Sequence, residues 1–497
     1  MDNKQKICFD SHKYIQKQSE IIRERLKKFD NKLYIEFGGK LFDDLHASRV
    51  LPGFESNVQI KLLDSFKDEC EIIFVISAKD IEKNKIRADF GITYDMEVLR
   101  LIEKLRNHGL YVSAVVITLF DGEQSALNFK AKLENLGERV YIHYFTKGYP
   151  TDVKTIVSEK GYGKNPYVET SRPLVAITAP GPGSGKLATC LSQLYHEYKK
   201  GVKAGYAKFE KFPVWNLPLK HPINLAYEAA TADLGDKNVI DSYHYEAYGK
   251  IAVSYNRDLE AFPVVKNIIN KIAGKEVYKS PTDMGINTIA SCIIDDDLAK
   301  ESAKQEIIRR YLRAKVDIKT NNIDKIIAQR ILLLMNELNI TIYDRKCVKP
   351  AEELSKKIHQ PTLSIELSNG QVVVGKKTNM LSAPADAILQ ALKVTSNLSS
   401  NCELLEDKIL QPIIDLRKNI FKQDNSTLTL KETLVALCVS SKFNKYAKVA
   451  YSNIEQLKHC NAHSTHILTT NNQETLRNLG LNVTCGDKFM VGNLFDM

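Results

Sequence analysis

A glycine-rich turn that ends on a lysine is the part of this chain best suited to chemistry. It consists of Ala179-Pro180-Gly181-Pro182-Gly183-Ser184-Gly185-Lys186. Backbone N–H groups in such a turn can converge on an anion, a following helix N-terminus adds partial positive charge, and the lysine adds a full charge. The turn therefore predicts a phosphate-binding site. The residues expected to hold the anion are Gly181, Gly183, Ser184, Gly185 and Lys186, and Lys186 is also a predicted catalytic residue.

The turn matches the phosphate-loop pattern G-x-x-x-x-G-K-[ST] only in part. Pro180 stands at the first glycine, and Leu187 stands where a Ser or Thr would ligate Mg²⁺. A leucine side chain cannot bind a cation, so the sequence leaves a requirement for Mg²⁺ undecided. Three hypotheses stay open. One is an enzyme that binds ATP or another nucleotide for phosphoryl transfer or ATP-driven ligation; the second is a Mg²⁺-independent phosphometabolite-binding protein or isomerase-type enzyme; the third is a plain turn in a non-catalytic scaffold protein.

Several polar residues follow other apolar strands and could reach the same crevice. Gly38 and Gly39 follow the strand Leu33–Phe37, in a string that looks like the strand-Gly-Gly segment of amino-acid kinases. Lys208 ends a glycine-strand-lysine segment that looks like the one after the phosphate loop in small ATP-dependent synthetases and kinases. We expect Gly38, Gly39 and Lys208 to contact the ligand, although a packed turn also explains the glycines.

The residues expected to complete the site come from the same strand ends and the loop that follows. Glu210 and His221 are predicted catalytic residues in a proline-rich loop over residues 209–222, which an interdomain connection would explain equally well. Glu36 and Asp43 are expected nearby, and Asp241 is a weak candidate for a Mg²⁺ ligand. The loops Ser254–Asp258 and Ser280–Asn287 either join the site or only form turns.

Histidines and cysteines near the end of the chain do not predict a zinc site. The run His459-Cys460-x-x-His463-x-x-His466 follows no established finger spacing, although His459 and His463 would share a face on a helix. The three acidic residues 295–297 directly precede a helix, so they predict helix capping and not metal binding.

Six apolar strands alternate with helices in the first 220 residues. The predicted strands are Leu33–Phe37, Ile72–Ile76, Tyr111–Ile117, Val140–Tyr144, Leu174–Thr178 and Ala204–Phe209, and the first helix is Ser11–Lys28. This alternation predicts a doubly wound, mostly parallel sheet with helices on both faces. We expect three domains: an α/β domain over residues 1–220 that contains the phosphate cradle, a helical domain over 221–345, and a smaller mixed α/β domain over 346–497.

The composition excludes several classes of protein. Of 497 residues, 43% are hydrophobic and 26% charged, which allows a sizeable core. No apolar stretch approaches the roughly 20 residues of a membrane span. Nine cysteines without a C-x-x-C pair fit free thiols in a reducing cytoplasm. A net charge of +10 is mild at this length, so we expect a nucleotide or small phosphorylated ligand and no nucleic acid or membrane partner. The sequence also allows a homo-oligomer.

Five long strings carry a family resemblance. They are EFGGKLFDDLHASRVLPGF, APGPGSGKLATCLSQLYHE, FPVWNLPLKHPINLAYEAATADL, SYNRDLEAFPV and YKSPTDMGIN. They resemble one bacterial family, domain-of-unknown-function family 1846, also called uncharacterised protein family 0371, and the resemblance covers nearly the whole chain. It implies an α/β domain, a helical domain and a mixed C-terminal domain. It implies no established activity and no catalytic residues.

Overall fold

The computed structural model describes residues 6–39, 41–42, 44–87, 91–321, 323–422 and 427–489. Contacts within the chain group it into two compact units, one over Lys6–Ala303 and one over the described residues from Lys304 onward. The division falls inside the helix α13 (Asp296–Thr320). Each unit is described by itself.

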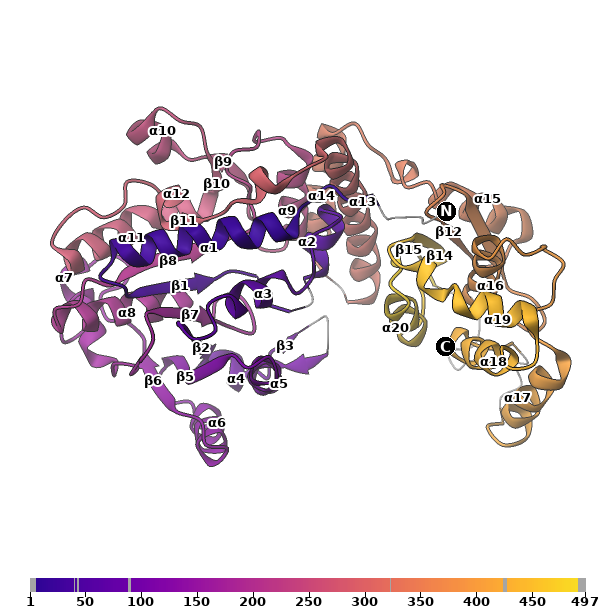
Figure 1. The fold of residues 1–497 in the computed structure, drawn as a ribbon, viewed down its shortest axis with the longest axis horizontal. Helices are drawn as coiled ribbons and strands as arrows, with labels where there is room; N and C mark the ends of the chain where they lie inside the picture. The colour runs from indigo at the N-terminus through magenta and orange to yellow at the C-terminus, as the bar shows by residue number, and fades with distance from the viewer. Residues whose placement is uncertain are drawn as a thin grey trace. The chain divides into compact units, whose positions relative to one another are not determined.

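A seven-stranded parallel sheet forms the centre of the N-terminal unit (Figure 1). The strand order is β11 (Gly285–Ile286), β8 (Gly205–Phe209), β1 (Leu33–Phe37), β7 (Leu174–Thr178), β2 (Cys70–Ser77), β5 (Tyr111–Phe120) and β6 (Val140–Tyr144). Every neighbouring pair runs parallel. All eight residues of β2 are buried, and successive residues of a strand face opposite sides, so helices must cover both faces. The predicted α/β fold class is confirmed.

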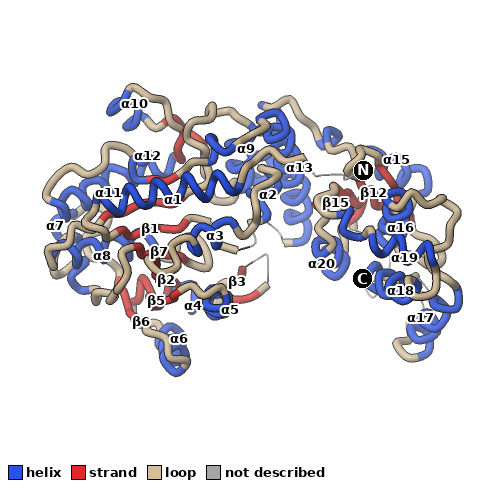
Figure 2. The backbone as a smooth tube through the Cα atoms, viewed as in Figure 1, coloured by secondary structure: helices blue, strands red, loops and turns tan. Residues whose placement is uncertain are grey.

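Helices and short strands surround this sheet (Figure 2). The longer helices are α1 (Ser11–Lys28), α5 (Tyr94–Asn107), α6 (Gln124–Asn135), α8 (Lys186–Lys199), α9 (Pro222–Ala230) and α11 (Asn256–Ala273). The shorter helices are α2 (Leu45–Val50), α3 (Val58–Asp64), α4 (Ala78–Glu82), α7 (Val153–Ile156), α10 (Ser242–Tyr248) and α12 (Pro281–Met284). Two small antiparallel pairs join β3 (Ile86–Arg87) to β4 (Ile92–Thr93) and β9 (Asn238–Ile240) to β10 (Val253–Tyr255).

The chain after residue 220 adds both a strand and helices to the N-terminal unit. We expected a separate helical domain over 221–345. Instead β11, which has two residues, pairs parallel with β8 and extends the main sheet, and α11 packs on α8. A two-residue strand is too short to be recognised in the sequence, because a strand is predicted from several alternating or continuous apolar positions.

A four-stranded mixed sheet forms the centre of the C-terminal unit. Its order is β13 (Val372–Lys376), β12 (Thr362–Glu366), β14 (Asn461–His466) and β15 (Asn482–Lys488). The first two neighbouring pairs run antiparallel, and β14 pairs parallel with β15. The helices are α14 (Lys325–Glu337), α15 (Val348–Ile358), α16 (Ala383–Thr395), α17 (Asp407–Asn419), α18 (Leu430–Ser440), α19 (Lys445–Ser452) and α20 (Thr470–Asn478). The predicted mixed α/β architecture is confirmed.

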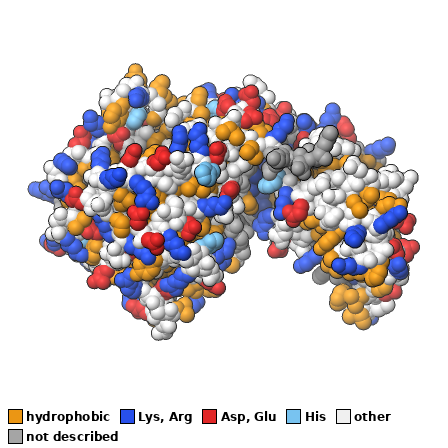
Figure 3. Space-filling model, viewed as in Figure 1, with side chains coloured by type: hydrophobic (Ala, Val, Ile, Leu, Met, Phe, Trp, Pro, Cys, Tyr) orange, Lys and Arg blue, Asp and Glu red, His pale blue; other side chains and the backbone are white. Residues whose placement is uncertain are grey.

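The surface and the helices agree with the composition. Lys and Arg side chains alternate with Asp and Glu over the visible face of both units (Figure 3), so the excess positive charge is spread out. The nine cysteines are free thiols. Among the described residues, none of the helices combines the length and the apolar character that crossing a membrane requires.

Candidate functional site

The glycine-rich turn joins the carboxyl end of β7 to the start of α8, as predicted. Gly183 and Gly185 have φ angles of +76° and +86°, in the left-handed region where a side chain is strained. Gly185 is the N-cap residue of α8, and no side chain caps that helix. The turn therefore depends on glycine at these two positions.

Hydrogen bonds and packing contacts stabilise this turn on its inner side. The hydroxyl of Thr118, at the end of β5, donates to the carbonyl of Ser184 over 2.7 Å. The buried Ser184 hydroxyl donates to the carbonyl of Gly181 over 3.0 Å. The ring of Tyr94 fills the space where Gly181 would carry a side chain. These contacts fix the backbone shape of the turn without using its outward-facing N–H groups.

The outward side of the turn is open. Within the described part of the chain, no acceptor receives the N–H groups of Lys186, Leu187 and Ala188 in the first turn of α8. A side chain placed on Gly183 would meet no atom within 4 Å. Unpaired N–H groups at a helix N-terminus attract anions, because the peptide dipoles add up to a partial positive charge there.

Lys186 faces the end of the neighbouring strand β1. Its Nζ lies 3.8 Å from Glu36 Oε1, and the two side chains are 14% and 13% exposed. The hydroxyl of buried Tyr206, on β8, donates to Glu36 Oε2 over 3.0 Å. Glu36 is thus held by β8 while it offsets the charge of Lys186.

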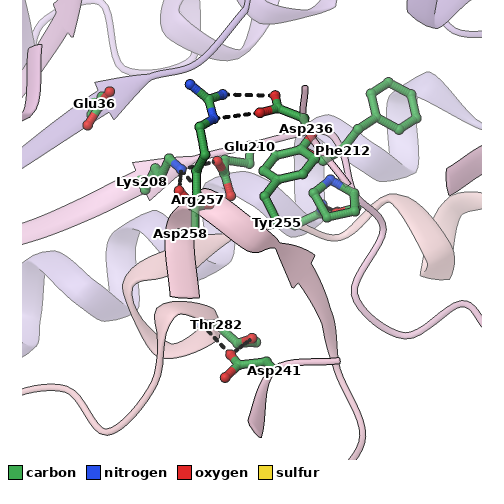
Figure 4. A network of polar contacts seen from close by, with 12 residues as sticks. Glu36, Lys208, Glu210, Phe212, Asp236, Asp241, Tyr255, Arg257, Asp258 and Thr282 are labelled. Atoms are coloured by element: carbon green, nitrogen blue, oxygen red, sulfur yellow. Dashed lines mark hydrogen bonds and ion pairs between the residues drawn. The ribbon is translucent and has the colours of Figure 1, made fainter. Parts of the chain in front are cut away.

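A second lysine lies between two carboxylates at the end of β8. Lys208 Nζ donates to both carboxylate oxygens of Asp258 over 2.7 Å and lies 2.5 Å from Glu210 Oε1 (Figure 4). Burial lowers the pKa of Lys208, but the charges of Glu210, Asp258 and Glu36 outweigh it and raise that pKa above its usual range. Lys208 therefore stays charged.

Glu210 has the most unusual acidity in this cluster. Burial raises its pKa, Lys208 opposes that rise, and the charges of Asp258 and Glu36 add to it, which places the pKa at about 7 instead of 4.5. A carboxyl group with a pKa near neutrality can both give and take a proton at physiological pH. Glu210 is accordingly the group in this cluster best suited to acid–base chemistry.

The acidity of Glu210 predicts a pH dependence of stability. Folded protein keeps this proton between about pH 4.5 and 7 while unfolded protein loses it, so stability from this group falls as pH rises through that window. Glu210→Gln cannot titrate. We expect its free energy of unfolding relative to the parent to rise by up to about 3 kcal/mol between pH 5 and pH 8, measured by urea denaturation. Exposed Glu103→Gln is the control, and equal differences at both pH values would contradict the assignment.

Alanine substitutions at the two left-handed glycines are expected to lower the free energy of unfolding by different amounts. Alanine at Gly185 is strained by φ and places its methyl 2.8 Å from Thr118 Oγ1, so we expect a loss of about 2–3 kcal/mol in unfolding free energy. Alanine at Gly183 has the same strain but open space, so about 1 kcal/mol is expected. Thermal or urea unfolding compares them. A larger loss for Gly183→Ala would show that contacts behind the turn do not set its shape.

Some predicted site residues come together and others do not. Glu36 lies by Lys186, and Glu210 lies by Lys208. Gly38 and Gly39 follow β1: the N–H of Gly38 donates to the carbonyl of Phe209, and the position of a Gly39 side chain would lie 3.5 Å from Lys211 Nζ. Their contact with a ligand stays a prediction. Asp43 lies outside the described residues.

His221 occupies a structural position. Its Nδ1 accepts the N–H of Ile223 and so caps α9. Its Nε2 lies 3.0 Å from Asp296 Oδ1, which requires the proton on Nε2. Burial lowers the pKa of His221, while Asp296 opposes that change. Both ring nitrogens are engaged, and neither contacts the Lys186 or Lys208 groups, so the structure does not bring His221 into the cluster.

Asp241 and Arg257 also have structural partners. Asp241 caps α10 by accepting the N–H of His244, and it accepts the N–H and hydroxyl of Thr282 (Figure 4). Arg257 pairs with Asp236, with 2.5 Å between Arg257 Nε and Asp236 Oδ1. These partners leave neither residue directed at the turn.

Asp258 is the site residue that the sequence did not single out. It lies in the first turn of α11, in a segment that the sequence presents as a polar loop but that consists of the end of β10 and the start of α11. Its contact with Lys208 joins residues 50 positions apart. A lysine and an aspartate at that separation have no sequence signal that links them.

His463 and His466 of the run near the C-terminus lie in the strand β14, which begins at Asn461, and not in the helix that we considered; His459 precedes the strand. β14 ends at His466. His463 is buried, and its Nδ1 lies 2.9 Å from Thr484 Oγ1. Among the described residues, no three His, Cys, Asp or Glu side chains are grouped to hold a metal ion. The prediction of capping at residues 295–297 is confirmed, because Asp295 accepts the N–H of Leu298.

The matches to known proteins cover nearly the whole chain. Residues 7–339 match the family model described as Domain of unknown function DUF1846, N-terminal, and residues 343–495 match the corresponding C-terminal model. A UPF0371 protein of Clostridium tetani (strain Massachusetts / E88) is 52% identical over 499 residues, which is 99% of each chain. UPF0371 proteins of Clostridium botulinum strains Kyoto / Type A2 and Alaska E43 / Type E3 are 51% and 52% identical, again over 99% of each chain. None of these descriptions states an activity.

Proposed function

The chain belongs to the DUF1846 family, also named UPF0371, and on that premise we propose that it is an enzyme that binds a nucleotide or another phosphorylated ligand. The ligand's phosphate group occupies the turn over residues 179–186. The observation that carries this proposal is the open start of α8, where three N–H groups have no acceptor among the described residues and Lys186 adds its charge.

The position of the turn in the sheet supports this proposal. β7 lies between β1 and β2 in the sheet, while the chain continues from β2 toward β5 and β6 on one side and from β7 to β8 on the other. Open parallel sheets bind ligands beyond the carboxyl ends of strands where the chain reverses its direction of winding. The turn follows the end of β7, and Glu36 and Lys208 are the second-last residues of β1 and β8, respectively, near that point.

The residues of the site have separate roles in the proposed reaction. The N–H groups of α8 and the Lys186 ammonium bind and orient the phosphate, and they stabilise charge that develops on it during transfer. Glu36 lies 3.8 Å from Lys186 Nζ and offsets part of its charge. Glu210, with a pKa of about 7, moves a proton to or from the reacting group, and Lys208 and Asp258 position its carboxyl.

Mg²⁺ has no hydroxyl ligand in this turn. The Ser184 hydroxyl donates to Gly181, and the Thr189 hydroxyl donates back to the carbonyl of Gly185. Leu187 stands where the phosphate-loop hydroxyl would be. The residues therefore do not fit the Mg²⁺ arrangement of a standard phosphate loop, and we derive no step through the ion. This favours the second candidate function, a Mg²⁺-independent reaction of a phosphometabolite such as an isomerisation.

Ligand-induced thermal stabilisation tests the proposal. The protein is melted with ATP, ADP, inorganic phosphate and a sugar phosphate, each with and without Mg²⁺. Stabilisation by ATP that needs Mg²⁺ would favour phosphoryl transfer or ligation. Stabilisation by small phosphates without Mg²⁺ would favour the second candidate. If no phosphate compound changes the melting temperature at millimolar concentration, the turn is not a phosphate site and the proposal is wrong.

A further inference from the structure

A cavity of about 530 Å³ lies in the N-terminal unit, outside the turn and the Lys208 cluster. Its walls come from the end of α1, the loop around Trp215, α10 and α12. We propose that this cavity is a second binding site, which takes a small anion carrying a planar ring, such as a nucleoside phosphate or an aromatic carboxylate. Its volume lies within the range of ligand pockets.

Positive charge dominates the lining of this cavity. Arg25, Lys28 and Lys250 line it, and within the described residues no carboxylate pairs with any of the three. The Arg25 guanidinium donates to the carbonyls of Asp283 and Gly285 over 2.6 and 2.7 Å. It also donates to the carbonyl of Met284 over 3.3 Å. Carbonyl partners orient a guanidinium but carry no opposing formal charge.

The single acid in the lining is already engaged. Asp283 accepts the hydroxyl of Tyr248 over 2.9 Å and the N–H of Lys279 over the same distance. His244 lies 3.9 Å from it. Three cations therefore face one carboxylate that is occupied by neighbours, which leaves a surplus of positive charge for the ligand.

Aromatic rings supply the rest of the wall. Trp215 packs against Gly285, and a side chain on Gly285 would collide with the indole. Tyr248 is 44% exposed, and Tyr278 and Phe29 are buried behind the cavity. Aromatic side chains beside cations that have no carboxylate partner suit a ligand with both a ring and a negative charge, because the ring can stack while the anion pairs.

The cavity is separate from the proposed phosphate site. Phe29, in its wall, packs against Gly205 at the first residue of β8, whereas the turn follows the last residue of β7. Phe29 and the turn therefore lie at opposite ends of these parallel strands. The Trp215 side of the cavity lies against Gly285 of the edge strand β11, and β8 and β1 lie between that strand and β7. α12 and β11 lie beside α1 in Figure 1, and Arg25 of α1 donates to the carbonyl of Asp283 in α12. The inference therefore does not depend on the proposed function.

Fluorescence of Trp215 tests this site directly, because Trp215 is the only tryptophan in the chain. The full-length protein is excited at a wavelength that tyrosine does not absorb, and titrated with AMP, benzoate, inorganic phosphate and acetate at constant ionic strength. We expect saturable changes with AMP and benzoate and tighter apparent binding for each than for the ring-free anion with the same charged group. If neither AMP nor benzoate gives a saturable change, the proposal is wrong. Equal affinities for ring-bearing and ring-free anions would contradict the requirement that the ligand carries a ring.

Three variants distinguish binding in this cavity from an effect of surface charge and from binding at the turn. Lys28→Glu combined with Lys250→Glu reverses two exposed charges of the lining and should weaken AMP binding at least about tenfold. Lys27→Glu makes the same change on an exposed neighbour outside the lining and should leave affinity within about twofold. Equal weakening in both proteins would overturn the site. Lys186→Ala should leave the Trp215 titration unchanged; loss of the signal in that variant would place the ligand at the turn instead.

Discussion

Lys208→Met is expected to destabilise the N-terminal unit by about 3 kcal/mol at pH 8. Lys208 is 23% exposed on its side chain and contacts Glu210 and Asp258. Without the ammonium, two carboxylates would face each other in a mostly buried place, which is costlier than the loss of an ordinary ion pair. Urea denaturation followed by Trp215 fluorescence measures the effect in this unit.

The pH dependence of this destabilisation shows whether it comes from the lost charge or from poor packing of the methionine side chain. Carboxylates without a cation hold protons more tightly in the folded than in the unfolded protein, so the destabilisation should shrink at pH 5, where they are protonated. Lys199→Met is the matched control, because it breaks an ion pair with Glu159 whose side chains are 53% and 70% exposed; an exposed pair contributes at most about 1 kcal/mol. A loss in Lys208→Met that is equal at both pH values would mean that charge is not its cause.

Lys186→Ala is expected to weaken binding of the phosphate-bearing ligand about 30- to 100-fold. The ammonium contributes a charge-assisted contact to phosphate, and such contacts are worth about 2–3 kcal/mol. The alanine variant should fold normally, since Lys186 Nζ is 3.8 Å from its nearest acid, Glu36, and forms no tight pair. Calorimetric titration with whichever phosphate compound stabilises the parent gives the ratio of dissociation constants.

Exposed Lys203→Ala removes the same charge beyond the other end of α8 and should change affinity less than about twofold, because screening weakens distant charges. Unchanged affinity in Lys186→Ala would exclude the turn as the phosphate site. A loss of melting temperature without ligand would instead indicate a structural role. The two lysines therefore differ: removal of Lys208 changes mainly the stability, and removal of Lys186 changes mainly the binding.

Apolar strands were predictable because their burial is two-sided. β1 and β7 lie inside the sheet and have the predicted bounds, as do the half-buried edge strand β6 and the helix α1. A strand in the middle of a parallel sheet must be apolar on both faces, and this leaves a continuous run that the chain alone reveals. The glycine turn was predictable for a related reason, since left-handed backbone at Gly183 and Gly185 requires glycine locally.

Polar strands and distant partners were not predictable. β14 is buried although its residues include His463, Ser464 and Thr465, because hydrogen bonds to neighbouring strands satisfy groups that look exposed in the sequence. β11 has two residues and is defined only by its partner β8. His221 looked like a catalytic residue, but its ring nitrogens cap α9 and contact Asp296.

The sequence by itself determined the parallel sheet, the mixed C-terminal fold, the position of the glycine turn and the family, because each depends on residues that are adjacent or regularly spaced. Only the tertiary structure decided which charges meet. Asp258 contacts Lys208, Glu36 contacts Lys186, and Arg25 faces a cavity beside Trp215. Acidity and binding depend on distances and burial in three dimensions, and side chains separated by tens or hundreds of residues acquire these only when the chain folds.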